Sequence, residues 1–149
     1  AIRNVTWYQG ESNAHNIELH ARLFHLLEKS WRQFFHRQKL PFLVVQLSSL
    51  NRPSWPEFRG SQRRLSARLP ETWLTVTSDL GDSLDVHYRN KQPVGERLAL
   101  QALHHVYEHH LVSEGPTCIK ASAVDNLVYL YFRMRMGYKT KEVLFRVLK

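Results

Sequence analysis

The chain has 149 residues, of which 43% are hydrophobic and 23% charged, with a formal net charge of +8. These proportions are typical of a globular domain with its own core and argue against a disordered chain. No apolar run reaches the ~20 residues of a membrane-spanning helix, so we expect no membrane partner. The single cysteine, Cys118, excludes an internal disulfide and is expected to be a buried free thiol.

The basic excess is concentrated in the C-terminal tail, with the rest spread over predicted helix faces. Its members in the tail are Arg133, Arg135, Lys139, Lys141, Arg146 and Lys149, which face only Glu142. No recognisable nucleic-acid motif accompanies these charges. We interpret them as solvated surface rather than as a site for an anionic substrate, and we expect no nucleic-acid partner.

The first 109 residues alternate between patterns typical of buried strands and patterns typical of amphipathic helices. We expect strands at 5–8, 42–47 and 73–78, and helices at about 15–36, 57–68 and 93–109. Asn13 is expected to cap the first helix, and Pro93 suits the first turn of the third. Strands that alternate with helices predict a parallel sheet with helices on both faces.

The pattern changes beyond Gly115 and Pro116. Short strands are predicted at 117–124, 127–132 and 143–147. We therefore divide the chain into a partial α/β domain at 1–112 and a β-rich basic tail, or the start of a β appendage, at 113–149.

A polar loop with the sequence GDSLDVH follows the third predicted strand and ends in Asp85-x-His87. A neutral imidazole can take a proton near pH 7, and a carboxylate two residues away can orient the ring. The pair therefore resembles the base-plus-orienter half of a hydrolytic triad. Asp79 and Asp82 compete for the orienting role, and the alternative is that these side chains only tie the loop together.

The loop after the first strand, with the sequence WYQGESN, has two interpretations. In the first, Ser12 is the nucleophile of a loosened G-x-S-x-G elbow whose final glycine is missing. In the second, the side-chain amide of Gln9 or Asn13 stabilises a developing oxyanion, and Glu11 fixes the loop by accepting hydrogen bonds. Ser12 could equally cap the next helix. The residues alone leave these alternatives open.

Two further sets of side chains suggest binding. His105 and His109 are four residues apart on a predicted helix, a spacing that zinc sites use, but no third ligand is evident and exposed helix-end histidines explain the pattern. We therefore expect no metal and no cofactor. Trp55, in a proline-rich loop, is a candidate for stacking on a sugar ring, whereas Trp31 and Trp73 are expected in the core.

The two loops and their surroundings resemble one known family. Residues 7–13 and 85–99, with the intervening segments 40–47 and 55–62, are similar to the sialate O-acetylesterase family of SGNH-type carbohydrate esterases. The resemblance runs in register over roughly residues 3–110. It implies a three-layer α/β/α fold of flavodoxin-like topology, incomplete at its N-terminal edge. It also implies hydrolysis of acetyl esters on sugar hydroxyls, in the best-known members on sialic acid.

The resemblance also assigns roles to individual residues. His87 matches the catalytic base and Asp85 its partner. Gln9 matches an oxyanion-hole or substrate-orienting position with Glu11 as its support, and Gly10 and Asn13 belong to the same loop. By this resemblance Ser12 is not the nucleophile.

One family feature is missing from these 149 residues. The family's nucleophilic serine lies in a Gly-x-Ser-Asn type loop after the first strand, and no such loop precedes Trp7 or follows it. We therefore expect the C-terminal part of a hydrolase domain, acting on an O-acetylated sugar with a serine from upstream or from a companion chain. The alternatives are a non-catalytic fragment or subunit of such an esterase, and a basic binding module.

Overall fold

The structure, a computed structural model, describes residues 2–125, 127–133 and 141–145. It forms two compact units, Ala1–His109 and His110–Lys149. The first unit contains three strands and three α-helices in the alternating order that the sequence predicts. Its elements are β1 (Val5–Trp7), the short 3-10 helix η1 (Glu11–Asn13), α1 (Ile17–Phe34), β2 (Phe42–Val45), α2 (Trp55–Arg68), β3 (Thr72–Thr75) and α3 (Gln92–His105).

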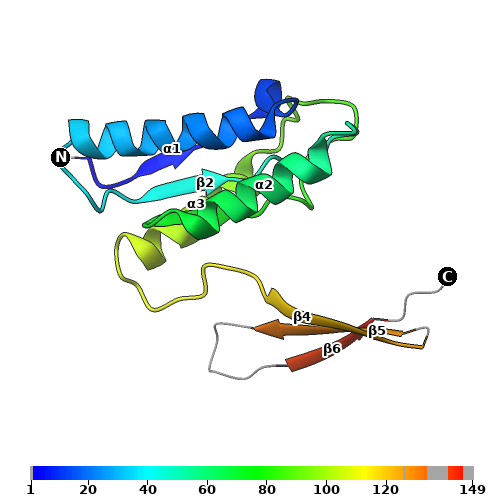
Figure 1. Cartoon of the computed structure of the whole chain (residues 1–149). Helices are drawn as coiled ribbons and strands as arrows, with labels where there is room; N and C mark the ends of the chain where they lie inside the picture. The colour runs from blue at the N-terminus through cyan, green and yellow to red at the C-terminus, as the bar shows by residue number, and fades with distance from the viewer. Residues whose placement is uncertain (1, 126, 134–140, 146–149) are drawn as a thin grey trace. The chain divides into compact units, whose positions relative to one another are not determined.

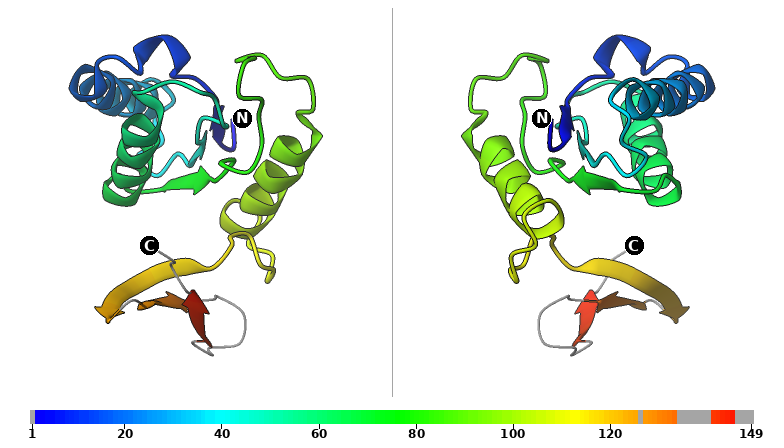
Figure 2. Two further views of the ribbon diagram at one scale, coloured as in Figure 1. Left: turned by 90° about the vertical axis from the view of Figure 1, so that its right-hand side faces the viewer. Right: turned by 90° about the vertical axis from the view of Figure 1, so that its left-hand side faces the viewer.

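The three strands of the first unit form one parallel sheet in the order β1-β2-β3 (Figure 1). Helices α1 and α2 cover one face of this sheet and α3 covers the other (Figure 2). This arrangement confirms the predicted parallel sheet flanked by helices. It also brings the carboxyl ends of all three strands to a single edge, where the connecting loops lie.

The core of this unit is built around the central strand. All four residues of β2 are buried, as its uninterrupted apolar sequence predicts for a strand covered on both faces. On one side Phe42 and Val44 pack with Val5 and with Phe24 of α1. On the other side Val45 packs with Val94 at the start of α3.

Helix α1 begins later than expected. Its N-cap is Asn16, whose side chain accepts a hydrogen bond from the backbone N–H of Leu19 at 3.1 Å. The prediction that Asn13 caps α1 is therefore wrong. Asn13 lies in η1, a short turn that precedes α1. Because Asn13 does not cap the helix, its side chain can form hydrogen bonds within the first loop.

The second unit is an antiparallel sheet in the order β4-β5-β6. Its strands are β4 (Thr117–Val124), β5 (Leu127–Arg133) and β6 (Lys141–Phe145). Cys118 is exposed, so the expectation of a buried thiol is wrong. The physical reason is that β4 is an edge strand with almost every residue exposed, so no layer covers its side chains within the described residues.

No helix in the described part of the chain is long and apolar enough to cross a membrane.

Candidate active site

The first polar loop turns sharply where β1 ends. Gly10 is buried and has a φ of 145°, a conformation that side chains with a Cβ rarely adopt. A Cβ placed there would lie 2.8 Å from the ring of Phe58, which is fully buried in α2. The glycine therefore allows the loop to pass directly over α2 before η1 begins.

Two hydrogen bonds hold the loop in this shape. The side-chain Nε2 of Gln9 donates to the Oδ1 of Asn13 at a distance of 2.5 Å. The backbone N–H of Asn13 donates to the carbonyl of Gly10 at a distance of 2.9 Å. The Gln9 amide is thus fixed through one of its two N–H groups. Its other N–H remains available to an acceptor outside the loop.

Ser12 is exposed and lies in the middle of η1. The nucleophile of a G-x-S-x-G elbow sits on a strained turn between a strand and a helix. In the described residues the positive φ of this loop falls on Gly10, and Ser12 is not among the residues with positive φ. This geometry favours the second interpretation of the loop over the elbow.

The second polar loop is anchored to the segment that follows β2. Gly81 has a φ of 113°, and a Cβ there would lie 2.5 Å from the carbonyl oxygen of Ser49. The backbone N–H of Ser49 donates to the carbonyl of Leu80 at 2.7 Å, and that of Asn51 donates to Ser83 at 2.9 Å. The loop that carries Asp85 and His87 is therefore tied at its start to the segment that follows β2.

Within this loop the carboxylates organise the backbone. Asp82 Oδ1 accepts the N–H groups of Leu84 and Asp85 at 2.8 and 3.3 Å. Asp85 Oδ1 accepts the backbone N–H of His87 at 2.7 Å. Both Asp85 and His87 are exposed. The carboxylate thus positions the backbone of His87. Among the hydrogen bonds of the described residues, none joins the Asp85 carboxylate to the His87 ring.

The structure removes one competitor for the role of orienting carboxylate. Asp79 forms a two-pronged pair with Arg97 of α3, with nitrogen–oxygen distances of 2.7 and 2.6 Å. The hydrogen bonds from Arg97 lower the pKa of Asp79 from 3.8 to about 2. Because both of its oxygens are engaged by Arg97, Asp79 serves to fix α3 beneath the loop rather than to orient His87.

The two loops meet at one small pocket at the carboxyl end of the sheet. Its wall includes Glu11 from the first loop, Val86 from the second, and Ser48, which follows β2. The hydroxyl of Ser48 lies 3.2 Å from that of Tyr8 and 2.8 Å from that of Tyr88. The hydroxyls of Tyr8, Ser48 and Tyr88 therefore form one hydrogen-bonded floor of the pocket.

Lys91 adds a positive charge to this floor. Its ammonium lies 3.4 Å from the centre of the Tyr88 ring and 3.4 Å from the hydroxyl of Tyr8. Burial raises the pKa of Tyr88, so this phenol remains a neutral hydrogen-bonding group. The sequence reasoning did not single out Tyr8, Tyr88 or Lys91 as site residues. The sequence signal that could have indicated them is their position: Tyr8 directly precedes Gln9, and Tyr88 and Lys91 follow His87.

Trp55 lines the shared pocket but is too buried to stack on a sugar ring. It is only 2% exposed, and its Nε1 donates to the carbonyl of Ser48 at 2.7 Å. The expectation that it stacks on a sugar ring is therefore wrong. The indole begins α2 and packs against Leu47 and Phe58, so it supports the pocket from below.

The histidines at the end of α3 have structural roles. The ring of His105 stacks on Trp73 with a centroid distance of 4.1 Å, and Nδ1 of His104 lies 3.1 Å from the carbonyl of His109. Among the described residues no group of three or more His, Cys, Asp or Glu side chains could hold a metal ion.

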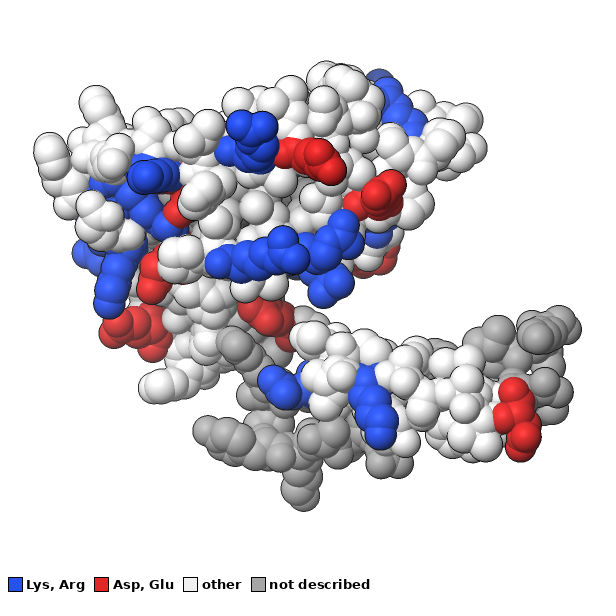
Figure 3. Space-filling view, viewed as in Figure 1, with Lys and Arg blue, Asp and Glu red and all other residues white. Residues whose placement is uncertain are grey.

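Charge on the first unit is mixed. On the face seen in Figure 3, Lys and Arg side chains are interspersed with Asp and Glu side chains. The basic residues there do not gather into a single patch of the kind that binds a nucleic-acid backbone.

The parallel sheet flanked by helices is structurally similar to that of a solved carbohydrate acetylesterase. A carbohydrate acetylesterase from Xanthomonas citri superposes with a TM-score of 0.80 and 34% sequence identity, covering 91% of this chain and 33% of that one. The sialate O-acetylesterase of Mus musculus is 37% identical over 138 residues, which cover 77% of this chain and 26% of that protein. The chain therefore spans a third or less of these relatives.

Residues 1–104 match the family model described as carbohydrate esterase, sialic acid-specific acetylesterase. The chain belongs to this family of carboxylic ester hydrolases. The family resemblance inferred from the two loops is thereby confirmed, and the partial coverage of the relatives is that of a fragment.

Proposed function

We propose that this chain carries the general base and the oxyanion-binding loop of an esterase that removes O-acetyl groups from sugars, with sialic acids as the acetylated sugars. The observation that carries the proposal is that the two loops meet at one pocket, which Glu11 of the first loop and Val86 of the second both line. Gln9 itself lines a separate groove along α1, and His87 lies exposed, one residue beyond Val86. Membership of the acetylesterase family supports the choice of substrate class.

In this mechanism His87 is the base and Asp85 its orienting partner. A serine hydroxyl attacks the acetyl carbonyl carbon, and its proton passes to the imidazole of His87. The imidazolium then returns that proton to the sugar oxygen as the C–O bond breaks. Water attacks the acetyl-serine in the same way and releases acetate. The backbone hydrogen bond from His87 to Asp85 holds the turn so that the second carboxylate oxygen can meet the ring.

Gln9 is the residue proposed to stabilise the tetrahedral intermediate. One N–H of its side chain is occupied by Asn13, which leaves the other to donate to the developing oxyanion. Gly10 allows the sharp turn that places Gln9 in this loop. Glu11 lines the pocket. The attacking serine is proposed to come from outside these 149 residues.

Two measurements test this proposal. The 149-residue chain alone should hydrolyse p-nitrophenyl acetate no faster than free imidazole at the same concentration. A burst of product that Ser12→Ala abolishes would contradict the proposal and restore Ser12 as the nucleophile.

In the esterase that contains both this chain and the serine-bearing part, His87→Ala should lower kcat by at least ~10³. His110→Ala, at another exposed histidine outside the two loops, is the control and should leave kcat unchanged. Retained activity in His87→Ala would show that another group is the base.

A further inference from the structure

Ser48 is a buried hydroxyl between the two polar loops. It follows β2 and is only 6% exposed. Its Oγ lies 3.2 Å from the hydroxyl of Tyr8 and 2.8 Å from that of Tyr88. Tyr8 directly precedes Gln9, and Tyr88 directly follows His87. One serine therefore contacts a neighbour of each of the two side chains to which the proposed function assigns chemistry.

The direction of these hydrogen bonds follows from counting protons. The Oγ of Ser48 donates to Oγ1 of Thr77 at 3.1 Å, and Thr77 donates in turn to the carbonyl of Gln46. A serine hydroxyl has one proton and two acceptor lone pairs. Because the only proton of Ser48 is directed to Thr77, the serine can only accept from the two phenols. Tyr8 and Tyr88 therefore both donate to one oxygen and occupy both of its lone pairs.

The partners of Ser48 on the other side make it a fixed point. Thr77 is fully buried, and the side-chain Nε2 of Gln46 donates to the carbonyl of Arg59 in α2 at 3.2 Å. The backbone N–H of Gln46 donates to the carbonyl of Thr75, at the end of β3, at 3.0 Å. The hydroxyl of Ser48 is thus bonded to groups that are themselves tied to the sheet and to α2. A loop that bonds to this hydroxyl takes its position from the core.

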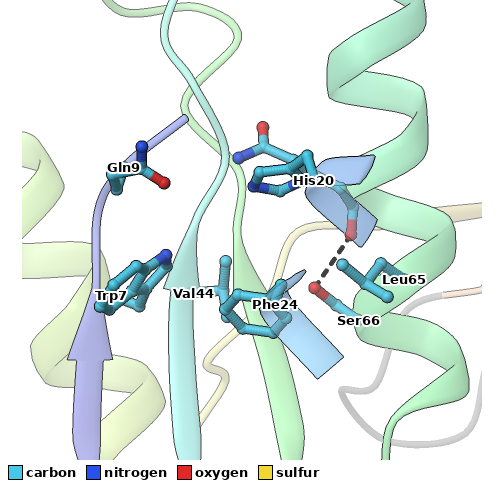
Figure 4. A pocket seen from close by; sticks show the side chains of 8 residues that line it. Trp7, Gln9, His20, Phe24, Val44, Leu65 and Ser66 are labelled. Carbon is cyan, nitrogen blue, oxygen red and sulfur yellow. Dashed lines mark hydrogen bonds between the residues drawn. The ribbon is translucent and has the colours of Figure 1, made fainter. Parts of the chain in front are cut away.

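The bond from Tyr8 fixes the backbone that carries Gln9. The two side chains point to different places, because Tyr8 lines the shared pocket whereas Gln9 lines the separate space shown in Figure 4. Tyr8 therefore anchors the end of β1 on one side, while the bond to Asn13 holds the Gln9 amide on the other.

The bond from Tyr88 limits where His87 can lie. His87 is exposed, and its backbone N–H is bonded to Asp85 within the same loop. Tyr88 is only 9% exposed and packs with Val45 of β2 and Val94 of α3. It is therefore a firm connection between the end of the second loop and the core.

Lys91 offers a second route between the loops. Its ammonium lies 3.4 Å from the hydroxyl of Tyr8 and 3.4 Å from the centre of the Tyr88 ring. Lys91 is exposed, so water competes for its ammonium and weakens both interactions. Ser48 is buried and lies closer to both hydroxyls, which favours the serine as the connection.

We propose that Ser48 is a positioning residue that sets the separation between the oxyanion-binding loop and the loop that carries the base. The inference rests on the proposed function, since it assigns Ser48 the task of holding Gln9 and His87 at one distance. Ser48 acts through Tyr8 and Tyr88 and needs no contact with the substrate. Catalysis depends on such a separation, because a misplacement of ~1 Å can cost ~10²-fold in rate.

The kinetic test uses the esterase that contains both this chain and the serine-bearing part. Ser48→Ala should lower kcat at least ~tenfold and leave KM within about threefold, because positioning acts on the chemical step. Tyr8→Phe and Tyr88→Phe each delete one hydroxyl, keep the ring, and should have smaller effects. The variant with both phenylalanines should be as slow as Ser48→Ala, because neither loop is then bonded to the serine.

Ser66→Ala is the matched control. Ser66 is also 6% exposed, but its hydroxyl donates to the carbonyl of Gln62 within α2 at 3.0 Å (Figure 4). That bond joins no loop to another, so Ser66→Ala should leave kcat unchanged. Thermal unfolding of each variant verifies that a loss of kcat is not a loss of folded protein.

A second measurement needs no turnover and uses the complete 149-residue chain. Tyr88→Phe, in the second loop, should shift the NMR signals of the Gln9 side-chain amide in the first. Tyr8→Phe, at the first loop, should shift the NMR signals of the His87 imidazole in the second. Both effects should disappear when Ser48 is replaced by alanine, because the loops then lose their common partner.

Two outcomes would overturn the proposal. One is a kcat of Ser48→Ala equal to that of Ser66→Ala. The other is a pair of NMR effects that persist in Ser48→Ala, which would assign the connection between the loops to Lys91. Failure of the proposed function looks different: activity would survive in His87→Ala while the NMR coupling through Ser48 remained.

Discussion

The side-chain amide of Gln9 is held by Asn13, four residues later, through a hydrogen bond of 2.5 Å from Nε2 to Oδ1. The two residues lie on either side of the turn at Gly10, so the bond closes the loop on itself. It also sets the direction in which the second N–H of Gln9 points. Asn13 is therefore a positioning residue for Gln9 if the loop stabilises an oxyanion.

This relationship predicts the outcome of a double-mutant cycle in the complete esterase. Gln9→Ala should lower kcat by about 10²–10³, as removal of an oxyanion donor does. Asn13→Ala should lower kcat by about tenfold, with KM little changed in both variants. Because Asn13 acts through Gln9, the double variant should be no slower than Gln9→Ala alone. Multiplicative losses would show that Asn13 has an independent role.

Replacement of Gly10 should destabilise the first unit. Gly10→Ala places a methyl group 2.8 Å from the Phe58 ring in a backbone conformation that alanine avoids. We expect a loss of about 2–4 kcal/mol in the free energy of unfolding, measured by urea denaturation. Gly95→Ala is the matched control, since nothing lies within 4 Å of its added Cβ in α3. It should be neutral or stabilising by up to about 1 kcal/mol. Equal effects at both sites would contradict this account.

The sequence predicted the order of the elements because burial and periodicity are local patterns. The run 42–47 is typical of a strand covered on both faces, and the structure has a strand over Phe42–Val45. The spacing of Phe24, Leu27 and Trp31 indicates a helix. Element ends were less accurate: Asn13 and Asn16 are both suitable caps, and only the presence of η1 decides between them.

Features that depend on distant contacts were not predictable. Trp55 is buried, and its indole N–H donates to the carbonyl of Ser48. The proline-rich sequence around Trp55 gives no indication of this contact. Asp79 is engaged by Arg97, 18 residues away on another element. That the outer edge of β1 has no partner strand among the described residues depends on which strands are neighbours, and this follows from the three-dimensional order of the sheet.

The ion pair between Asp79 and Arg97 should make the free energy of unfolding depend on pH in the acidic range. The pKa of Asp79 is lowered from 3.8 to about 2 in the folded state, so its ionised form stabilises the fold. This contribution is fully present above pH ~4 and is lost as the pH falls toward 2. Because the side chain of Asp79 is 59% exposed, solvent screening limits the effect to about 1 kcal/mol or less.

Asp79→Asn should remove this contribution to the free energy of unfolding, measured by urea denaturation between pH 5 and pH 2. At pH 5 the variant should be less stable than the parent chain, and at pH 2 the two should converge. Added salt should reduce the difference. A difference that persists at pH 2 would mean that the substituted amide perturbs the loop by another route.

The strongest stability prediction concerns Glu28 and Arg32, an ion pair one helical turn apart in α1. Both are buried, at 3% and 5% exposure. Arg32 also donates from Nε to the carbonyl of Leu40 at 3.2 Å and from a terminal nitrogen to that of Pro70 at 2.7 Å. The guanidinium thus joins α1 to the segments before β2 and β3. A lysine cannot reproduce this planar set of donors.

Removing one partner of this pair leaves a buried charge uncompensated. Glu28→Leu and Arg32→Met should each cost about 3–5 kcal/mol in the free energy of unfolding, measured by urea denaturation. The double variant should cost clearly less than the two losses added together, because neither charge then remains buried alone. Arg32→Lys should still destabilise the chain, since it keeps the charge but loses bonds to the carbonyls. Single-variant losses below about 1 kcal/mol would show that water reaches the pair and solvates it.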